Sequence, residues 1–398
     1  MWSLILIAAD ECNAYVFTRI VDSGVMAPGG TANYLHFGHI STDGKDIAFW
    51  SVNSNGIRGA YRTLNGSVEL IADGNMPIPT GSGNFQEFGP PYVQGNKVVF
   101  AGGISSTSML FINEGNHTTR LLGDPVMLSG TFQTITRFND ISFVGDDIGI
   151  SVQGDAGGDG VFLIVDGSLE LVADDATGIP GGSGNFFGFQ EVSNYGSNIA
   201  FTAIGPVIGR PDRNGLYAYR NGSIELIANN ATPVPQASVN LFQGFNNPIM
   251  QGSTVYFMGQ YINGVGQGIF RDDGSGIVPE ITTAPVTFPF GGGGRFTSLS
   301  LVGADDDNLV VNGFDTLVPG AESVYLRYNG QWHVVIRDND IIDGVMVVDI
   351  KNVAFDGDMI ALALKMADGS EAIYTVVVPE PASVAITILG GLIVIRRR

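Results

Sequence analysis

The sequence predicts an all-β fold, a seven-bladed β-propeller, and three observations lead to this prediction. The first is composition: of 398 residues, 56 are glycine, 44% are hydrophobic and only 15% are charged, which is typical of many tight turns around an apolar interior. The second is a repeat with a period of about fifty residues, the length of a blade of four antiparallel strands. The third is that this repeat is incomplete at both ends in a complementary way, as in a ring closed by both chain ends.

Each repeat contains a turn glycine followed by a short strand of alternating apolar residues. The first copy runs from Gly44 to Phe49 and the second from Gly95 to Phe100, and the last two copies are looser. The seven glycines are separated by 51, 50, 51, 56, 51 and 54 residues, so we expect seven similar units. They are Gly44, Gly95, Gly145, Gly196, Gly252, Gly303 and Gly357.

A β-hairpin follows this strand in the repeats. Its clearest copy is Gly215–Ala228, with Asn221-Gly222 at its centre. Asn-Gly and Asp-Gly favour the positive φ angles of two-residue hairpin turns, so these dipeptides predict the tips of the hairpins. The five turns of this kind are Asn65-Gly66, Asp166-Gly167, Asn221-Gly222, Asp273-Gly274 and Asn329-Gly330.

A pair of large apolar residues, three positions apart, precedes the first strand of each repeat. We expect these pairs to pack between neighbouring blades; the alternative is a platform on which sugar rings stack. The pairs are Tyr34/Phe37, Phe85/Phe88, Phe132/Ile135, Phe186/Phe189, Phe242/Phe245, Phe296/Leu299 and Val347/Ile350.

The two ends of the repeat region supply one blade between them. The last repeat has only three strands, because a single strand, Glu371–Val378, follows the strand of the seventh turn glycine. The missing strand lies near the N-terminus, where residues from Tyr15 onward align with the stretch that ends at Asp73. We therefore expect Tyr15–Val21 to pair with Glu371–Val378 and close residues 15–378 into a ring, which hides both sheet edges. The alternative is an open array of β-sandwiches.

Residues 1–14 are predicted to be a short or truncated signal peptide. Trp2–Ala9 is largely apolar, and Cys12-Asn13-Ala14 places small residues at the two positions that a signal peptidase reads. No Lys or Arg precedes the apolar run, however, and Asp10-Glu11 follow it. The alternative is a structured first strand.

Residues 379–398 combine a short polar motif, an apolar segment and a terminal basic cluster. The apolar run Ala382–Ile395 is short for a membrane span, which needs roughly 20 residues. Three consecutive arginines resist translocation and stay on the cytoplasmic face, so the run is predicted to be a transmembrane helix that stops transfer. The alternative is a buried core segment. The motif and the basic cluster consist of Pro379, Glu380, Pro381, Arg396, Arg397 and Arg398.

This tail resembles the PEP-CTERM sorting signal, which is found at the C-terminus of many exported bacterial proteins. The resemblance rests on Val378-Pro379-Glu380-Pro381, the short apolar segment and the arginines, in that order at the chain end. It implies export, anchoring in the inner membrane through the C-terminal helix, and recognition and cleavage near Pro379-Glu380-Pro381 by an exosortase-type enzyme. It also implies delivery to the cell surface or to an extracellular matrix, and it implies no biochemical activity.

Charge and cysteine content exclude several classes of partner and site. The 19 basic and 39 acidic residues give a formal charge of −20, which repels nucleic acids and anionic lipid headgroups. The one cysteine, Cys12, lies in the predicted signal peptide. We therefore expect the mature chain to have no disulfide, no thiolate nucleophile and no cysteine-based metal site.

An Asp or Asn closes the fourth strand of most repeats. Such a ring of oxygens is compatible with calcium, but a side chain that bonds its own backbone at the start of a loop is the simpler interpretation and the one we expect. The densest acidic cluster contains Asp338, Asp340 and Asp343, which are weak calcium candidates because the spacing and terminal Glu of an EF-hand are missing. The closing residues are Asp22, Asp73, Asp124, Asp174, Asn229 and Asp338.

The sequence contains no recognisable catalytic set. The histidines are scattered, and His36 and His39, three residues apart in a predicted strand, are expected to point to opposite faces. No G-x-S-x-G elbow or phosphate-binding loop is present. Paired carboxylates for glycoside cleavage stay an open alternative, because their separation is spatial.

The sequence therefore predicts an exported binding or scaffold protein of the cell surface or extracellular matrix that is not an enzyme. One alternative is a hydrolase or lyase that acts on extracellular polysaccharide, which requires a histidine and acidic residues within hydrogen-bonding reach in one pocket. Another is a structural module stabilised by calcium. No other cofactor is expected.

Overall fold

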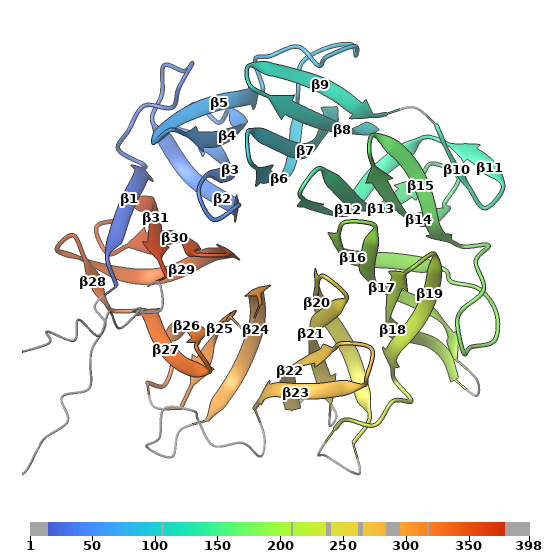
Figure 1. Ribbon diagram of the computed structural model, residues 1–398. Coiled ribbons are helices and arrows are strands. Elements are labelled where there is room, and N and C mark those ends of the chain that lie inside the picture. Colours follow the sequence, from blue (N-terminus) through green and yellow to red (C-terminus); the bar gives the residue numbers. More distant parts are fainter. Residues whose placement is uncertain are drawn as a thin grey trace, which may run out of the picture.

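The computed structural model is a ring of seven antiparallel sheets (Figure 1). It describes residues 15–104, 107–123, 125–207, 210–235, 240–261, 266–283, 295–306, 308–316 and 318–378. The predicted all-β, seven-bladed propeller is thus confirmed. The predicted signal peptide, sorting motif, transmembrane helix and arginine cluster lie outside the described residues. Within the described ranges, no helix has the length and apolar character of a membrane span.

Blades 1 to 6 are continuous four-stranded meanders, in which the first strand is innermost. Blade 1 contains β2 (Tyr34–Thr42), β3 (Ile47–Asn53), β4 (Arg58–Leu64) and β5 (Ser67–Asp73); blade 2 contains β6 (Glu87–Gln94), β7 (Lys97–Ile104), β8 (Thr107–Glu114) and β9 (His117–Leu122). Blade 3 contains β12 (Ile135–Val144), β13 (Asp147–Gly154), β14 (Asp159–Val165) and β15 (Ser168–Asp174); blade 4 contains β16 (Gly188–Tyr195), β17 (Asn198–Val207), β18 (Arg210–Arg220) and β19 (Ser223–Asn229). Blade 5 contains β20 (Phe242–Gln251), β21 (Thr254–Tyr261), β22 (Gly266–Asp272) and β23 (Ile277–Thr282); blade 6 contains β24 (Phe296–Asp305), β25 (Asn308–Asp315), β26 (Glu322–Tyr328) and β27 (Gln331–Arg337).

Blade 7 is built from both ends of the described chain. Its strands are β29 (Val345–Asp356), β30 (Met359–Met366), β31 (Glu371–Val377) and β1 (Phe17–Asp22), with the short β28 (Ile341–Ile342) beside β29. β1 pairs antiparallel with β31, and the register sets Phe17 opposite Val376 and Val21 opposite Ile373. This pairing confirms the predicted closure and excludes the open array.

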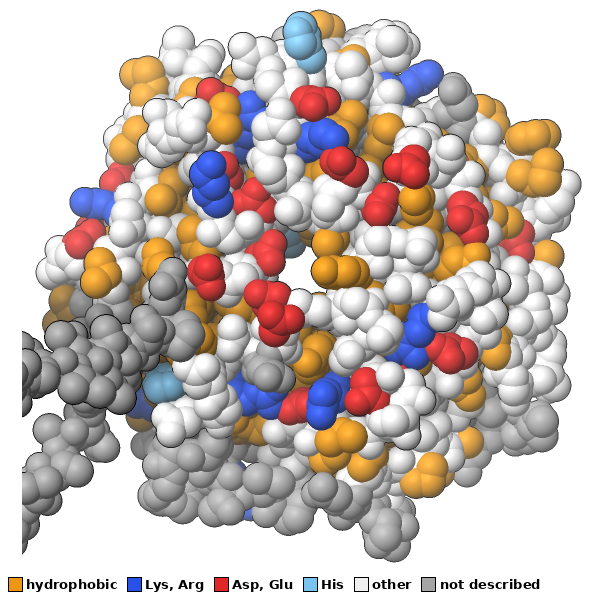
Figure 2. All heavy atoms as spheres, in the orientation of Figure 1, with side chains coloured by type: hydrophobic (Ala, Val, Ile, Leu, Met, Phe, Trp, Pro, Cys, Tyr) orange, Lys and Arg blue, Asp and Glu red, His pale blue; other side chains and the backbone are white. Residues whose placement is uncertain are grey.

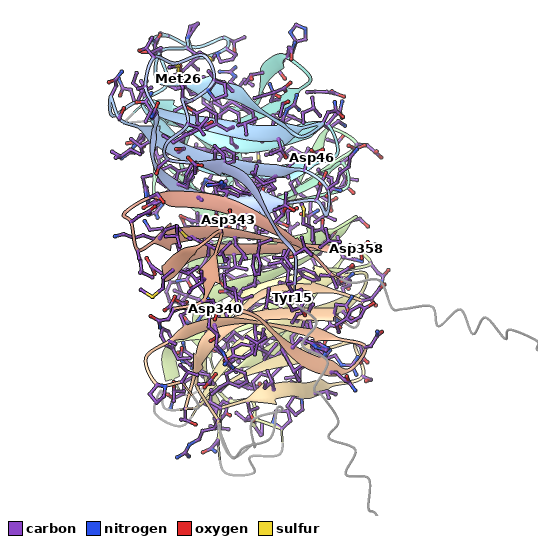
Figure 3. The ribbon with its side chains drawn as sticks, turned by 90° about the vertical axis from the view of Figure 1, so that its left-hand side faces the viewer. Tyr15, Met26, Asp46, Asp340, Asp343 and Asp358 are labelled. Atoms are coloured by element: carbon purple, nitrogen blue, oxygen red, sulfur yellow. The ribbon has the colours of Figure 1, made fainter. Side chains whose placement is uncertain are left out.

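The two faces of the ring carry different connections. Figure 3 places Met26, Asp340 and Asp343 on one face, here called the loop face, where the chain passes from one blade to the next. Asp46 and Asp358 lie on the opposite face, the turn face, beside the turns between first and second strands. Each inner strand therefore begins at the loop face and ends at the turn face.

Four of the five predicted hairpin tips have the expected backbone. Asn65, for example, has φ 52° and Gly66 has φ 78°, and the tips at 166, 221 and 329 match them. The tip at Asp273-Gly274 is different, because a four-residue loop joins Asp272 to Ile277 there. The Asp273 carboxylate accepts a hydrogen bond from the amide of Ser275 at 2.9 Å, and the positive φ falls on Gly274 and Gly276.

Gly303 is the exception among the seven predicted turn glycines. The other six have positive φ, between 55° and 81°, whereas Gly303 lies inside β24 and the turn comes later, at Asp306 with φ 49°. Its requirement is space: a Cβ there would lie 2.8 Å from the ring of Phe355 in the next blade. The prediction of a turn at Gly303 was wrong because close packing also selects glycine.

The hydrophobic core is divided among the seven junctions between blades. At the junction of blades 7 and 1, Tyr34, Phe37 and Phe49 pack with Ala361 and Ile373. The other six clusters follow the same plan, so the predicted packing of the apolar pairs between blades is confirmed for six of the seven pairs.

The pair Phe132/Ile135 in blade 3 was assigned wrongly. Phe132 is 72% exposed on an extra hairpin formed by β10 (Val126–Leu128) and β11 (Thr131–Gln133). The buried pair is shifted by three residues, with Ile135 in the core and Phe138 packed against it. Phe132 has the expected sequence spacing from Ile135, but it belongs to the inserted hairpin and does not reach the junction between the blades.

Every inner strand contains a β-bulge near its middle. In β2 the pairing with β3 shifts between Phe37 and Ile40, and a shift of one residue recurs in the inner strands of the six other blades, up to two positions later in the repeat. A bulge adds a residue to one strand and re-aims the side chains around it. Here it turns side chains toward the axis of the ring.

Candidate functional site

The inner strands of all seven blades line a central channel of about 760 Å³. Figure 2 shows the channel opening at the centre of one face, with Asp and Glu side chains gathered around it. Asp305 and Asp356 line the channel where β24 and β29 end, at the turn face. Burial, together with the neighbouring Asp305 and Asp43, raises the pKa of Asp356 to about 6. This end of the channel therefore repels anionic ligands.

Most acidic side chains in the channel tie neighbouring blades together. The Asp140 carboxylate accepts a hydrogen bond from the amide of Val192 at 2.9 Å, and that of Glu191 accepts one from the amide of Asn247 at 2.5 Å. Both carboxylates lie at the β-bulges of their strands. Their role in the structure is therefore to link neighbouring blades by hydrogen bonds.

A histidine, His39, and a tyrosine, Tyr92, lie beside Asp140 in the channel. Burial raises the pKa of Asp140 to about 7, and the Tyr92 hydroxyl donates to Asp140 Oδ1 at 3.4 Å. The His39 ring centroid lies 5.3 Å from that of Tyr92, and burial lowers the pKa of His39 to about 4. His39 Nδ1 is buried and has no hydrogen-bond partner among the described residues. His39 is thus a neutral side chain at physiological pH.

A second group of polar side chains lies nearer the loop face, at the junction of blades 7 and 1. A cavity of about 670 Å³, here called the mouth pocket, is lined by His36, His39, Trp50, Asp349 and Lys351, together with Glu322 of blade 6. The two histidines have different neighbours: His36 Nδ1 contacts Glu371 of blade 7, whereas the His39 ring packs against Tyr92 of blade 2. The two side chains therefore point toward opposite neighbouring blades, in agreement with the prediction that they point to opposite faces.

The base of the mouth pocket is an ion-pair cluster. Lys351 Nζ donates to Glu371 Oε1 at 2.6 Å, and His36 Nδ1 lies 3.0 Å from Glu371 Oε2. The Phe37 amide also donates to Oε2, at 2.9 Å. Burial opposes the charge of Glu371, but the bonds from Lys351 and Phe37, with the nearby His36, lower its pKa overall. The condition set for the enzyme alternative, a histidine and acidic residues within hydrogen-bonding reach in one pocket, is met only in part: His36 lines the mouth pocket and contacts Glu371, but Glu371 is not among the residues that line it.

Trp50 forms one wall of the mouth pocket. Its ring centroid lies 5.7 Å from that of His36, in an edge-on arrangement. The ring occupies the space above Gly38, where a Cβ would approach it to 2.0 Å. Gly38 is thus needed for the position of Trp50.

The weak calcium candidates engage separate partners. Asp338 Oδ2 accepts the amide of Glu322 at 3.1 Å, and Asp340 Oδ2 accepts the amide of Arg337 at 2.7 Å. Asp343 Oδ2 accepts the hydroxyl of Tyr374 at 3.1 Å. In the part of the chain that the structure describes, no group of His, Cys, Asp and Glu has the arrangement of a metal site.

The residues that close the fourth strands behave as expected in four cases. Asp22, Asp73, Asp174 and Asn229 each accept the amide of the residue two positions later, at 2.8 to 3.0 Å. Each thus starts its loop by bonding its own backbone, as predicted. Asp338 differs, since it bonds the neighbouring strand, and Asp124 lies outside the described residues.

Trp50, Lys351 and Glu371 were not identified from the sequence. The contact between His36 and Glu371 joins residues 335 positions apart, and only ring closure brings them together. The predicted ring closure already implied that the start of β31 lies beside blade 1, although it did not identify the contact between His36 and Glu371. The bulge between Phe37 and Ile40, beside the mouth pocket, left no signal in the sequence.

No protein-family model and no curated protein matches this sequence. Solved structures match it at low identity. The β-propeller domain of the Trilobed protease from Pyrococcus furiosus is 10% identical, with a TM-score of 0.54 over 90% of this chain and 100% of that one. The polysaccharide lyase Uly1 is 11% identical, with a TM-score of 0.52 over 90% of this chain and 94% of that one. The acylaminoacyl peptidase of Pyrococcus horikoshii is 12% identical, with a TM-score of 0.50 over 85% of this chain, which spans 52% of the peptidase. These similarities show that the chain has the β-propeller fold.

Proposed function

We propose that this protein is an exported propeller of the cell surface or extracellular matrix that binds polysaccharide at the mouth pocket. The observation that carries the proposal is the combination of Trp50, His36 and Lys351 in one cavity of about 670 Å³. An aromatic face packs against the C–H groups of a sugar ring, and polar side chains around it bond the hydroxyls. The mouth pocket has both components.

The closing cluster gives the mouth pocket a fixed shape. Glu371 contacts Lys351 Nζ at 2.6 Å and His36 Nδ1 at 3.0 Å, so the two basic side chains are oriented before any ligand arrives. Orientation in advance lowers the entropic cost of binding. A rigid wall of this kind is suited to recognition, and the propeller acts as its scaffold.

Export and sorting are supported by the C-terminal residues. Pro379-Glu380-Pro381, the apolar run and Arg396–Arg398 are the parts of a PEP-CTERM signal, so the partners proposed for this tail are an exosortase-type enzyme and the inner membrane. Fractionation of cells that express the full chain, or the chain lacking Arg396–Arg398, tests this. The full chain is expected to pass through the membrane fraction to the surface, and the shortened chain to lose membrane retention. Equal distribution of the two forms contradicts the proposal.

A second candidate function is cleavage of the bound polysaccharide. It is favoured by His36, whose Nδ1 lies 3.0 Å from the Glu371 carboxylate, because a histidine oriented by a carboxylate is suited to act as a general base. The fold also carries a polysaccharide-degrading activity in the lyase Uly1. Asp349 and Glu322 line the same pocket and are available as partners in proton transfer.

One experiment separates binding from cleavage. The full chain is mixed with a panel of neutral and acidic polysaccharides, and both affinity and the release of new chain ends are measured. W50L is expected to bind about tenfold more weakly, which corresponds to about 1.4 kcal/mol. H36A is expected to abolish any cleavage while binding persists, and K45A, on the turn face, serves as the control. Binding that W50L leaves unchanged contradicts the mouth pocket as the site.

A further inference from the structure

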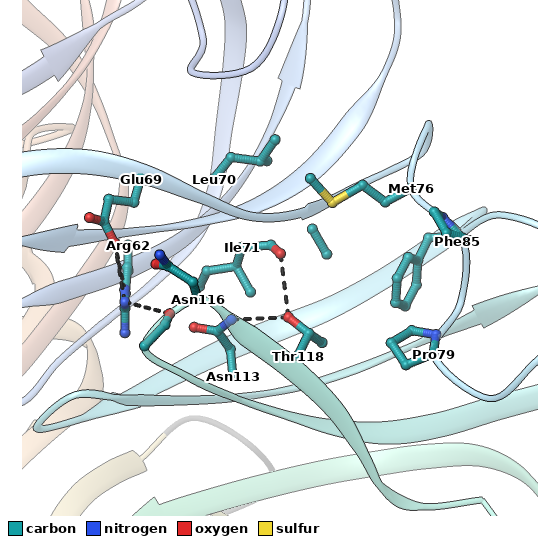
Figure 4. Close-up of a pocket in the computed structure, with 13 residues that line it drawn as sticks. Arg62, Glu69, Leu70, Ile71, Met76, Pro79, Phe85, Asn113, Asn116 and Thr118 are labelled. Atoms are coloured by element: carbon teal, nitrogen blue, oxygen red, sulfur yellow. Dashed lines mark hydrogen bonds and ion pairs between the residues drawn. The ribbon is translucent and has the colours of Figure 1, made fainter.

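Two further pockets lie near the outer rim of the ring, at the junction of blades 1 and 2 and at that of blades 4 and 5. The first, of about 320 Å³, is shown in Figure 4, and the second has a volume of about 590 Å³. We call them rim pocket 1 and rim pocket 2. Each has a buried arginine on one side and the proline-containing loop that leads to the next blade on the other.

Rim pocket 1 is built around Arg62, which is only 2% exposed. Its guanidinium donates to Glu69 Oε2 at 3.1 Å and to the backbone carbonyls of Asn96 and Gly115 at 2.8 and 2.9 Å. Glu69 neutralises the charge of the arginine. The pocket therefore offers hydrogen-bonding groups without a net positive charge.

Asn113 gives rim pocket 1 an unused acceptor. The side chain is 4% exposed, and its amide nitrogen donates to Thr118 Oγ1 at 3.0 Å (Figure 4). Its carbonyl oxygen, Oδ1, is buried and has no partner among the described residues. A buried acceptor without a donor is unfavourable, so a group that supplies a donor here is stabilised.

The opposite wall of rim pocket 1 is apolar. Met76, Pro77 and Pro79 come from the loop after β5, and Phe85 lies just before β6 (Figure 4). A ligand that fits must therefore present an apolar side to this wall and hydrogen-bonding groups to Asn113 and Glu69.

Rim pocket 2 repeats this plan with different residues. Arg220, 9% exposed, donates to Glu225 Oε1 at 2.5 Å and to Asp272 Oδ2 at 3.3 Å, and Pro233 and Pro235 form the apolar side. Its register in the blade is not that of Arg62, since Arg62 pairs with Glu69 and Arg220 with Ser223. Arg62 and Arg220 thus occupy different positions in their hairpins, yet each places its guanidinium at a junction between two blades.

The unused group in rim pocket 2 is a donor. Arg220 Nε is buried and has no hydrogen-bond partner among the described residues. Rim pocket 1 lacks a donor for Asn113 Oδ1, and rim pocket 2 lacks an acceptor for Arg220 Nε. A carboxylate or phosphate does not satisfy the first, and an ammonium group does not satisfy the second. A hydroxyl donates and accepts, so it satisfies both.

We propose that the two rim pockets are binding sites for uncharged, hydroxyl-rich ligands of the size of a single sugar unit. The sugar C–H surface packs on the proline wall, and its hydroxyls supply the hydrogen-bond partners that Asn113 Oδ1 and Arg220 Nε lack among the described residues. Because the pockets are three junctions apart, one molecule holds two sugar chains at once. This proposal stands apart from the mouth pocket, which shares no residue with either rim pocket.

Calorimetric titration of the full chain with methyl glycosides of neutral hexoses, pentoses and 6-deoxyhexoses tests the proposal. At least one glycoside is expected to occupy two sites in addition to any binding at the mouth pocket. N113L is expected to weaken rim pocket 1 at least tenfold, whereas N113D, which keeps an acceptor at that place, retains binding. R220K keeps a cation beside Glu225 and Asp272 but lacks Nε, and it is expected to weaken rim pocket 2 by a similar factor. The double variant N113L/R220K then shows no saturable binding at the rim.

Two controls keep the outcome clear. Thermal unfolding of each variant establishes that it is folded, and K45A, on the turn face and outside the mouth pocket and both rim pockets, leaves the rim titration unchanged. The proposal is overturned if no glycoside binds saturably, or if N113L and R220K bind as the unaltered chain does. Binding of triglycine without binding of any glycoside also overturns it, because peptide amides would then be the occupant.

Discussion

At two junctions of the ring a carboxylate accepts a backbone amide of the neighbouring blade, but the pKa of one carboxyl group is lowered and that of the other is raised. At the junction of blades 7 and 1, the Glu371 carboxylate accepts the Phe37 amide at 2.9 Å; at that of blades 3 and 4, the Asp140 carboxylate accepts the Val192 amide at 2.9 Å. Glu371 also contacts Lys351 and a histidine, and its pKa is lowered. Asp140 has the Ile141 amide and the Tyr92 hydroxyl as its other partners, and burial raises its pKa to about 7.

The difference shows where the ring depends on charge. Blades 3 and 4 are consecutive in the chain, so the hydrogen bond from the Val192 amide to Asp140, without an ion pair, suffices to orient them. The chain also passes directly from β1 of blade 7 to β2 of blade 1, but β1 is joined to the other strands of blade 7 only by its pairing with β31, because these strands come from opposite ends of the described chain. The ion pair, which involves the first residue of β31, therefore lies where the ring is closed by pairing alone.

The largest effect is expected from removing β1. Deletion of residues 17–22 leaves β31 as an unpaired edge and uncovers the core at the junction of blades 7 and 1, which includes Ile373. We expect a loss of about 5 kcal/mol or more in the free energy of unfolding. Urea unfolding followed by fluorescence measures it. A synthetic peptide of residues 15–24, added in trans, is expected to restore part of the loss, whereas a scrambled peptide does not.

The next largest effect distinguishes the two carboxylates. E371A leaves Lys351 and the Phe37 amide without their acceptor, and we expect it to cost about 2–3 kcal/mol. D140A also frees an amide, but it removes a buried charge that has no cation beside it, so we expect about 1 kcal/mol. Equal losses in urea unfolding would show that the two junctions do not differ as described.

The pH dependence of stability should have opposite signs at the two sites. The folded-state pKa of Asp140, about 7, is above its unfolded value of roughly 3.9, so its contribution is complete below about pH 4 and is lost as the pH rises toward 7. The pKa of Glu371 is lowered, so its contribution is present above its unfolded value of roughly 4.3 and is lost on acidification below that.

Urea midpoints between pH 3.5 and 8 test these signs. D140N is expected to flatten the curve between pH 4 and 7, and E371Q to flatten it only in the acid range. Parallel curves for D140N and the unaltered chain would contradict the assignment of Asp140.

The smallest effect is expected away from the junctions, at a hairpin tip on the outer rim. N65A places a side chain that disfavours left-handed backbone at φ 52°, and we expect a loss of about 1 kcal/mol. N65G keeps that conformation accessible and is expected to be nearly neutral. Thermal unfolding of both variants provides the measurement, and an equal loss in both would indicate that the Asn65 side chain has a role beyond backbone conformation.

The repetitive parts of the fold were predictable because the same physical requirement recurs. Turn residues with positive φ, such as Asn65-Gly66, and loop-starting residues such as Asp73 have local causes that are visible in the sequence. The complementary ends predicted the pairing of β1 with β31 for the same reason. Errors arose where one residue type serves two purposes, as Gly303 does, or where an insertion such as β10–β11 imitates the repeat.

The candidate sites were mostly not predictable. The mouth pocket needs a bulge at Phe37–Ile40 and a contact across 335 positions, and neither has a local signature. The rim pockets depend on which buried atoms lack partners, such as Asn113 Oδ1, and that requires the positions of all neighbours. Sequence patterns specify the framework, whereas these sites are properties of its junctions.

The order of strands in blade 7 has a mechanical consequence. β31, which ends at Val377, lies between β30 and β1 rather than at the edge of its sheet. A force applied to the chain beyond Val377 pulls along the axis of β31, and the hydrogen bonds to both neighbours must shear together before the strand moves. For the C-terminal anchor proposed above, this order of strands would spread the tension over two strand interfaces.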